Sequence, residues 1–351
     1  MAKIPDKAIR VAVIGVGRMG RHHVRTYRNL PQANLVAVVD ADAQRAAAVA
    51  DEFGCAALAD VEELLARFPE VQAVTVAVPT VHHAAVAAPL LQRGIACLVE
   101  KPLAPTVEEA QRLATMAHDH GAIVQVGHTE RFNPAVRAVA AMNITPRFIE
   151  VDRISSMTFR SLDVGVVMDM MIHDLDIVLM LARSPLVKVD AAGVAVLGQH
   201  EDVANARLVF ASGCVANLTA SRLAMKTERK LRLFSEEAYV SLDYQKRTGL
   251  VLRKSDNAQA LDRVRRQIVA GADLSDLEYA DLVHIHELTM DEADQGDALT
   301  AELSSFLNAV RDHCRPDVDA QAGSDAVEAA MRVVEAIAAH QWDGLTSSRV
   351  K

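Results

Sequence analysis

The stretch Val11-Ala12-Val13-Ile14-Gly15-Val16-Gly17-Arg18-Met19-Gly20 decides the fold of the first third of this chain. Its apolar start predicts a strand over 11–14, and the GxGxxG spacing that follows opens a helical pattern to about Leu30. In such a turn the first glycine bends the chain, the second lets a pyrophosphate approach the backbone, and the third lets helix and strand pack closely. Residues 15–20, including Arg18 and Met19, are therefore predicted to bind a dinucleotide at the helix N-terminus.

An acidic residue follows the second predicted strand. That strand covers Leu35–Val39, and Asp40 ends it. A carboxylate at this place accepts hydrogen bonds from ribose hydroxyls and repels a 2′-phosphate, and the next three residues, 41–43, bring no cation. The sequence therefore favours NAD over NADP, although Arg45 could still swing toward a phosphate.

Strand and helix patterns alternate throughout residues 1–128. Strands separated by helices of this length predict parallel βαβ units, and hence a doubly wound Rossmann sheet that binds NAD. The further predicted strands are Ala73–Val78, Ala96–Val99 and Ile123–Val126. The further predicted helices are Ala41–Phe53, Val61–Phe68, Val81–Arg93 and Thr106–His120.

In residues 129–351 strand and helix patterns no longer alternate, and most strand patterns follow one another directly. This order predicts an α+β domain with a large, mostly antiparallel open sheet. Short turns between 187 and 252 indicate an antiparallel meander. The predicted strands are Arg147–Ser156, Val189–Val196, Ala204–Phe210, Val215–Ser221, Leu231–Phe234, Tyr239–Asp243 and Leu250–Leu252. The predicted helices are Asn133–Met142, Val166–Leu181, Leu299–Val310 and Ala326–Ala339, and residues 255–296 have no clear pattern beyond a basic, helix-like piece.

Charge and cysteine usage exclude several classes of function. The chain has 37 Lys and Arg against 46 Asp and Glu, a net charge of −9, which argues against general binding to nucleic acid or anionic membranes. A signal peptide is not recognisable and no apolar run approaches a membrane span, so we expect a cytoplasmic protein. His284 and His286 have no evident third ligand, so no metal site is expected. The cysteines form no CxxC motif and indicate a reducing compartment: Cys55, Cys97, Cys214 and Cys314.

Two segments carry candidate catalytic residues. Glu100-Lys101-Pro102 follows a predicted strand, at the end where open parallel sheets place their ligand crevice. On the predicted helix 166–181, His173 follows Asp169 by four residues and Asp176 follows His173 by three. The three side chains would therefore share one face of the helix. A carboxylate at that spacing orients an imidazole and stabilises its cation, as a general base requires. A plain surface lysine and a structurally satisfied histidine are the alternatives.

Together these segments resemble the glucose–fructose oxidoreductase/inositol dehydrogenase family of Rossmann dehydrogenases. The resemblance spans almost the whole chain, and EKP with the later DxxxHxxD helix is its most distinctive part. Many members have several glycines before the helical aspartate, whereas only Gly165 remains here. The matching segments are GVGRMG at 15–20, Asp40, Pro79 with His83, EKP at 100–102, GHTERFNP at 127–134, MDMMIHDLD at 168–176, Asp297–Glu302 and Ser305-Phe306.

The resemblance implies roles for these residues. Lys101 would lie between nicotinamide and substrate, His173 would take the hydroxyl proton, and Asp169 would help to hold the substrate. The open sheet would make homodimer or homotetramer contacts. The residues implied to contact the cofactor, besides those of the glycine turn, Asp40 and Lys101, are Pro79, His83 and Glu100. The residues expected to contact the substrate are Arg131, Asn133, Asp169 and His173.

The family mostly oxidises sugars, cyclitols and nucleotide-sugars. Segments 127–134 and 171–176 look most like the branch that oxidises the 3-hydroxyl of UDP-N-acetylglucosamine, on the route to a diamino sugar of lipid A, with an aminotransferase acting next. The arginines that could serve a diphosphate, or could simply pair with carboxylates, are Arg131, Arg153, Arg160 and Arg222.

Three alternatives stay open at this point. They are a dehydrogenase of a free sugar or inositol, an enzyme that shuttles hydride between two sugars on a tightly held cofactor, and a non-enzymatic NAD-binding regulator. Lys101, Asp169 and His173 argue for an enzyme.

Overall fold

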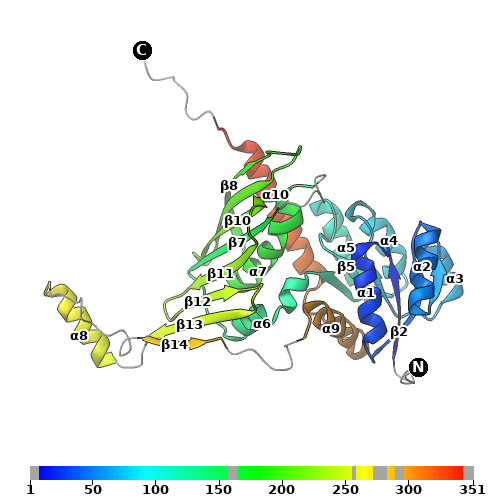
Figure 1. Ribbon diagram of the computed structural model, residues 1–351, viewed down its shortest axis with the longest axis horizontal. Helices are drawn as coiled ribbons and strands as arrows, with labels where there is room; N and C mark the ends of the chain where they lie inside the picture. The colour runs from blue at the N-terminus through cyan, green and yellow to red at the C-terminus, as the bar shows by residue number, and fades with distance from the viewer. Residues whose placement is uncertain (1–7, 157–163, 255–257, 272–282, 289–295, 343–351) are drawn as a thin grey trace, which may run out of the picture. The chain divides into compact units, whose positions relative to one another are not determined.

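The computed structural model describes residues 8–156, 164–254, 258–271, 283–288 and 296–342 (Figure 1). The chain forms two compact units. The first comprises Met1–Phe132 and Gly296–Glu335, and the second comprises Asn133–Gln295 and Ala336–Lys351. This division differs from the predicted single boundary at residue 128, because the chain returns to the first unit near its C-terminal end.

The described residues of the first unit form a six-stranded parallel sheet with the order β3-β2-β1-β4-β5-β6, which confirms the predicted Rossmann fold. Every residue of β4, β5 and β6 is buried, as expected for parallel strands covered on both faces. The strands are β1 (Ile9–Ile14), β2 (Ala33–Val39), β3 (Ala56–Leu58), β4 (Ala73–Val76), β5 (Ala96–Glu100) and β6 (Val124–Gly127). The helices are α1 (Arg18–Asn29), α2 (Ala43–Phe53), α3 (Val61–Arg67), α4 (His83–Leu91) and α5 (Val107–Asp119).

Two later segments complete this unit. Helix α9 (Ala298–Asp312) buries Leu303 and Phe306 in the same apolar core as Val24 and Tyr27 of α1. The loop before α10 (Ala320–Ala339) covers the edge strand β6, whose Val126 N–H donates to the Val318 carbonyl at 2.8 Å. An uncovered edge strand and an uncovered apolar helix face are both unfavourable, which explains why the chain returns here.

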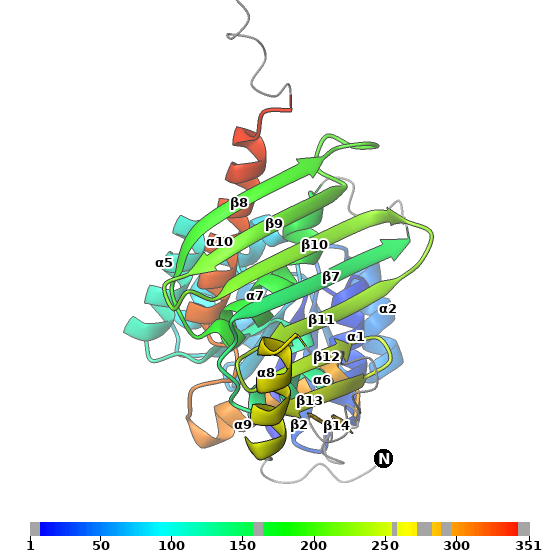
Figure 2. The same ribbon diagram turned by 90° about the vertical axis from the view of Figure 1, so that its left-hand side faces the viewer.

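The second unit contains an eight-stranded sheet in its described residues, with the order β14-β13-β12-β11-β7-β10-β9-β8 (Figure 2). Its pairs are antiparallel except β7 with β10, so the predicted open sheet is confirmed. The predicted simple meander is wrong, because β7 lies between β10 and β11 and splits it. The strands are β7 (Phe148–Ser156), β8 (Leu186–Val194), β9 (Val203–Phe210), β10 (Val215–Ala224), β11 (Glu228–Phe234), β12 (Ala238–Asp243), β13 (Thr248–Lys254) and β14 (Val283–Glu287).

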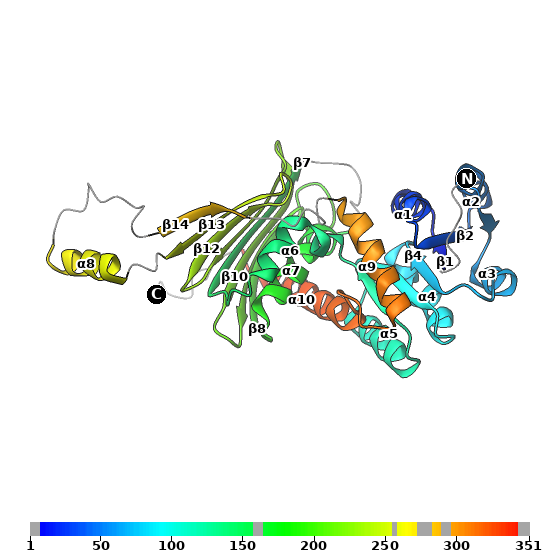
Figure 3. The ribbon, with the colours of Figure 1, turned by 90° about the horizontal axis from the view of Figure 1, so that it is seen from below.

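Helices cover one face of this sheet. Figure 3 shows α6 (Pro134–Ala141) and α7 (Ile172–Ala182) on the same side of it, and alternate residues of β7, β9 and β10 are buried accordingly. Helix α8 (Ala258–Val269) lies in the chain between β13 and β14. The predicted helix 166–181 is not uniform, because a π-helix, Val167–Met171, precedes α7. Among the described helices, none has the length and apolar character needed to span a membrane.

Candidate active site

The glycine turn after β1 has the geometry that a dinucleotide requires. Gly15 has φ 82°, and a Cβ there would lie 2.7 Å from the carbonyl of Ala77. A Cβ on Gly20 would overlap the carbonyl oxygen of Gly15, so this position must stay without a side chain. At Gly17, by contrast, a Cβ would meet no described atom within 4 Å, and no side chain caps the start of α1 there. The open side of Gly17 and the helix N–H groups therefore fit a pyrophosphate.

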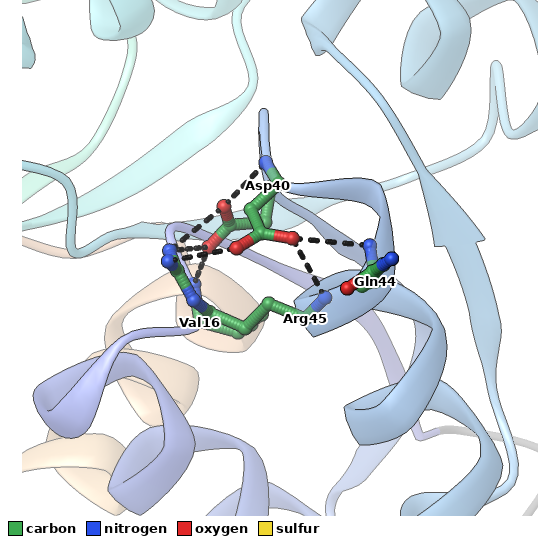
Figure 4. Close-up of polar contacts among 5 residues, drawn as sticks. Val16, Asp40, Gln44 and Arg45 are labelled. Carbon is green, nitrogen blue, oxygen red and sulfur yellow. Dashed lines mark hydrogen bonds and ion pairs between the residues drawn. The ribbon is translucent and has the colours of Figure 1, made fainter.

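Asp40 is held firmly at the end of β2 (Figure 4). Its Oδ2 accepts a hydrogen bond from the Val16 N–H at 2.9 Å, and its Oδ1 accepts one from the Asp42 N–H at 2.9 Å. The Arg45 guanidinium lies 3.1 and 3.2 Å from the two Asp40 oxygens and 3.0 Å from Asp42. The carboxylate is thus oriented beside the glycine turn. Its contact with a ribose stays a prediction, as does any swing of Arg45.

The segment after β5 is anchored by a buried histidine. Nδ1 of His83 lies 2.9 Å from the Pro102 carbonyl oxygen and 3.3 Å from that of Leu103, and Nε2 lies 3.0 Å from the Val78 carbonyl oxygen. Burial lowers the pKa of His83, although these carbonyl groups favour the protonated form. Lys101 is half-buried, and its peptide bond to Pro102 is cis. The ring therefore joins the loops after β4 and β5, while Pro79 is exposed.

A buried polar cluster, which sequence reasoning missed, lies beside this segment. His23 Nε2 is 2.7 Å from Glu100 Oε1, and Thr129 Oγ1 donates to Glu302 Oε2 at 3.0 Å. Burial and the nearby charge of Glu100 raise the pKa of Glu302 well above its ordinary value. Burial alone would raise the pKa of Glu100, but the hydrogen bond and charge of His23, followed by the charge of Lys101, bring it below that value. The signal available for His23 was its helical spacing from Gly20 and Tyr27, which places it on the core-facing side of α1.

In the second unit, Asp169 lies in the π-helix and His173 in the first turn of α7, and both are half-buried. Asp176 is almost fully buried and belongs to the core side of the helix. The loop before them contains Gly165, where a Cβ would overlap the side chain of Glu201. Glu201 Oε1 accepts a hydrogen bond from the Val167 N–H at 3.1 Å. A side chain at position 165 would therefore displace the Glu201 carboxylate from this hydrogen bond.

Two of the four candidate arginines have structural tasks instead. Arg153 forms a two-bond ion pair with Asp174, at 2.6 and 2.8 Å, and both side chains are buried. Arg222 pairs with the fully buried Asp202 at 2.8 Å. A buried guanidinium needs such a partner, so for these two arginines the second alternative, pairing with a carboxylate, is confirmed. Arg160 lies outside the described residues.

The two substrate candidates of segment 127–134 differ. Asn133 caps α6, since its Oδ1 accepts from the Ala135 N–H at 3.1 Å while its Nδ2 donates to the Tyr244 carbonyl at 3.3 Å. Asn133 is buried, whereas Arg131 is half-buried. Capping alone explains the asparagine, so its contact with substrate stays a prediction.

The predicted catalytic residues are divided between the units. Lys101 belongs to the first, whereas Asp169 and His173 belong to the second. The meeting of all three at one substrate stays a prediction. In the described part of the chain, no group of three His, Cys, Asp or Glu side chains is placed to hold a metal ion.

Comparisons with known proteins agree with this geometry. Residues 9–128 match the oxidoreductase family with an NAD-binding Rossmann fold, and residues 135–241 match the GFO/IDH/MocA C-terminal domain. The chain is 37% identical over 333 residues to UDP-N-acetylglucosamine 3-dehydrogenase of Acidithiobacillus ferrooxidans, covering 94% of this chain and 98% of that protein. A solved structure of the same-named enzyme from that organism has a TM-score of 0.81 at 35% identity, and the alignment covers 95% and 98% of the two chains.

More distant relatives share less. Inositol 2-dehydrogenase of Corynebacterium glutamicum is 31% identical over 195 residues, which cover 53% of this chain and 57% of that protein. A structure of levoglucosan dehydrogenase in complex with NADH and levoglucosan has a TM-score of 0.79 at 18% identity, covers 95% and 98% of the two chains, and shares the fold.

Proposed function

Because this chain belongs to the NAD-binding Rossmann oxidoreductases with a GFO/IDH/MocA C-terminal domain, we propose that it oxidises the 3-hydroxyl of UDP-N-acetylglucosamine to a ketone. The observation that carries this proposal is the identity of 37% over 94% of the chain to an enzyme of that name. The anchored Lys101 segment and the half-buried Asp169 and His173 support it.

Each residue has a defined task in this proposal. The glycine turn and Asp40 hold the dinucleotide by its pyrophosphate and ribose. Bound NAD supplies the hydride acceptor for the sugar carbon. Lys101 donates a hydrogen bond to the reacting oxygen, and His173 removes the hydroxyl proton as general base. Asp169 precedes His173 by four residues and helps to hold the substrate.

The cellular setting follows from the same proposal. A 3-keto nucleotide-sugar is a substrate for an aminotransferase, and the resulting amine would enter the lipid A diamino-sugar route. Four free cysteines and a diffusible nicotinamide cofactor fit a cytoplasmic location. Of the four arginines considered for the diphosphate, Arg131 is half-buried and stays the candidate for this contact.

The test is NADH formation by purified protein with NAD and UDP-N-acetylglucosamine, followed by mass spectrometry of the sugar product. The product should be two hydrogens lighter, and N-acetylglucosamine, myo-inositol and NADP should react at least about tenfold more slowly. Turnover of a free sugar or cyclitol in place of the nucleotide-sugar would refute the substrate proposal. Absence of turnover across the panel, with NADH still bound, would favour the regulator.

The general base is tested by His173→Ala, which should lower kcat roughly 100-fold or more while the Kd for NADH changes little. His118→Ala is the matched control, because His118 is an exposed histidine of α5 outside the proposed site. Equal turnover of both variants would remove His173 from the mechanism.

We propose further that two copies associate through the open face of the eight-stranded sheet. One apolar row crosses seven strands in register there, with ring centroids 5.8 Å apart for Phe148 and Phe234 and 4.9 Å apart for Phe234 and Tyr239. Beside this row, one sequence neighbour in each of four strands is buried: Ile149 of β7, Leu233 of β11, Val240 of β12 and Val251 of β13. The row consists of Val209, Val215, Phe148, Phe234, Tyr239, Leu252 and Ile285.

An exposed apolar row of this length would promote aggregation of a monomer, and such rows are typical of the buried centre of a subunit interface. Light scattering after gel filtration should give a dimer or tetramer mass, and Phe234→Glu with Leu252→Glu should give a monomer. Val81→Glu alters an equally apolar residue that is 65% exposed and should leave the mass unchanged. A monomeric wild-type protein would refute this assembly.

A further inference from the structure

Helix α1 contributes one buried polar side chain that reaches the segment of Lys101. His23 is fully buried, and its Nε2 lies 2.7 Å from Oε1 of Glu100, which is 7% exposed. Its Nδ1 has no hydrogen-bond partner among the described residues, so the polar contact of this ring is directed to Glu100. The same helix begins at the glycine turn. A hydrogen bond therefore joins the nucleotide-binding helix to the residue that precedes Lys101.

The Glu100 carboxylate is fixed on its other side as well. Its Oε2 accepts a hydrogen bond from the Lys101 N–H at 3.3 Å. A Cβ on Gly127 of β6 would lie 3.0 Å from the same oxygen, so the glycine makes room for the carboxylate. Replacing a buried polar pair by apolar residues of similar size is often neutral or stabilising, so stability alone is a weak reason for this contact. The arrangement therefore suggests a task in positioning.

Four titratable groups face Glu100 from the elements around it. They are His23 from α1, His83 at the start of α4, Glu302 from α9, and the adjacent Lys101. Burial together with the charge of Glu100 raises the pKa of Glu302, so Glu302 retains a proton where Glu100 is ionised. A single negative charge thus lies in this buried cluster, next to Lys101.

We propose that His23 is a positioning residue that keeps Glu100 ionised and in place, and that Glu100 in turn holds the Lys101 ammonium for the reaction. The inference rests on the proposed role of Lys101 as the group that contacts the reacting oxygen. Removal of His23 leaves Glu100 buried with its main polar partner gone, and this favours a neutral carboxyl. Lys101 then loses the neighbouring negative charge, so its side chain is held less firmly and reaches an external reagent more readily.

The experiment compares full-length variants of His23 with a matched control. His23→Leu removes the hydrogen bond, and His23→Gln restores an N–H near the position of Nε2. Tyr27→Phe, one turn later on the same face of α1, removes an equally buried hydrogen bond of 2.9 Å to Thr75 that does not involve Glu100. Acylation of Lys101 by acetic anhydride, followed by peptide mass spectrometry at several pH values, reports on its amine without any substrate.

At pH 8, Lys101 in His23→Leu should react roughly tenfold faster than in the wild type, and His23→Gln and Tyr27→Phe should react at the wild-type rate. With UDP-N-acetylglucosamine, kcat of His23→Leu should fall at least about tenfold while the Kd for NADH changes less than about twofold.

Equal acylation rates in His23→Leu and Tyr27→Phe would overturn the inference. Should the wild type oxidise no sugar, the proposed function fails, and the acylation rates still decide the role of His23. If His23→Leu does not fold, His23→Gln is compared with His23→Asn, whose side chain is too short to reach Glu100. Equal kcat values and equal acylation rates in these two variants would also overturn the inference.

Discussion

Replacing Glu302 with glutamine should change how the stability of the protein depends on pH. Glu302 is fully buried on α9, and burial with the nearby charge of Glu100 raises its pKa well above the ordinary value of 4.5. The folded protein therefore holds a proton that the unfolded chain has released. The stability that protonated Glu302 contributes is fully present below pH 4.5 and is lost as pH rises toward the folded-state pKa of Glu302.

The magnitude of this loss follows from linkage. One proton bound by the folded state alone costs about 1.4 kcal/mol of stability for each pH unit inside this window. Glutamine resembles the protonated acid and has no such proton to lose. The unfolding free energy of Glu302→Gln minus that of the wild type should therefore rise by about 1.4 kcal/mol per pH unit and then level off at the folded-state pKa.

Urea denaturation followed by circular dichroism, repeated at half-unit pH steps from 5 to 8, measures this difference. Thr129→Val is the control, because it removes the hydroxyl that donates to Glu302 and keeps the carboxyl. It should change the level of stability and keep the wild-type slope. Parallel curves for Glu302→Gln and the wild type would refute the assignment of a buried, protonated Glu302.

Three further experiments test the two units. Arg153→Met should lower the free energy of unfolding, measured by urea denaturation, by about 3–5 kcal/mol because it leaves the buried Asp174 without its ion-pair partner. The double variant with Asp174→Leu should recover most of this loss. A single variant as stable as the wild type would contradict the pairing. Gly20→Ala should lower Tm and NADH affinity together, whereas Gly17→Ala should lower NADH affinity alone, and identical behaviour of the two would oppose the geometry of the turn. Asp40→Asn should reduce the preference for NAD over NADP by about tenfold in kcat/KM, and an unchanged ratio would remove the ribose contact.

Local pattern was sufficient for the Rossmann part of the fold. The strand before Gly15, the glycine spacing and the acidic end of β2 act within about 30 residues of each other, and each has a steric or electrostatic requirement readable from residue type. The strand at 56–58 was not predicted, since three residues are too few to display a period. The π-helix before α7 was likewise not predicted, because its residues have the apolar pattern of an ordinary helix.

The sequence by itself determined the fold class, the family and the candidate residues Asp40, Lys101 and His173, because these depend on local spacing and residue chemistry. Tertiary structure alone decided that β7 enters the sheet between β10 and β11, and that α9 returns to cover α1. It also decided the partners of buried polar side chains, which lie at least 20 residues apart in the chain: Arg153 with Asp174, Arg222 with Asp202, and His23 with Glu100. Strand order and the pairing of buried charges are settled by which distant surfaces must exclude water together, and a one-dimensional pattern does not contain that choice.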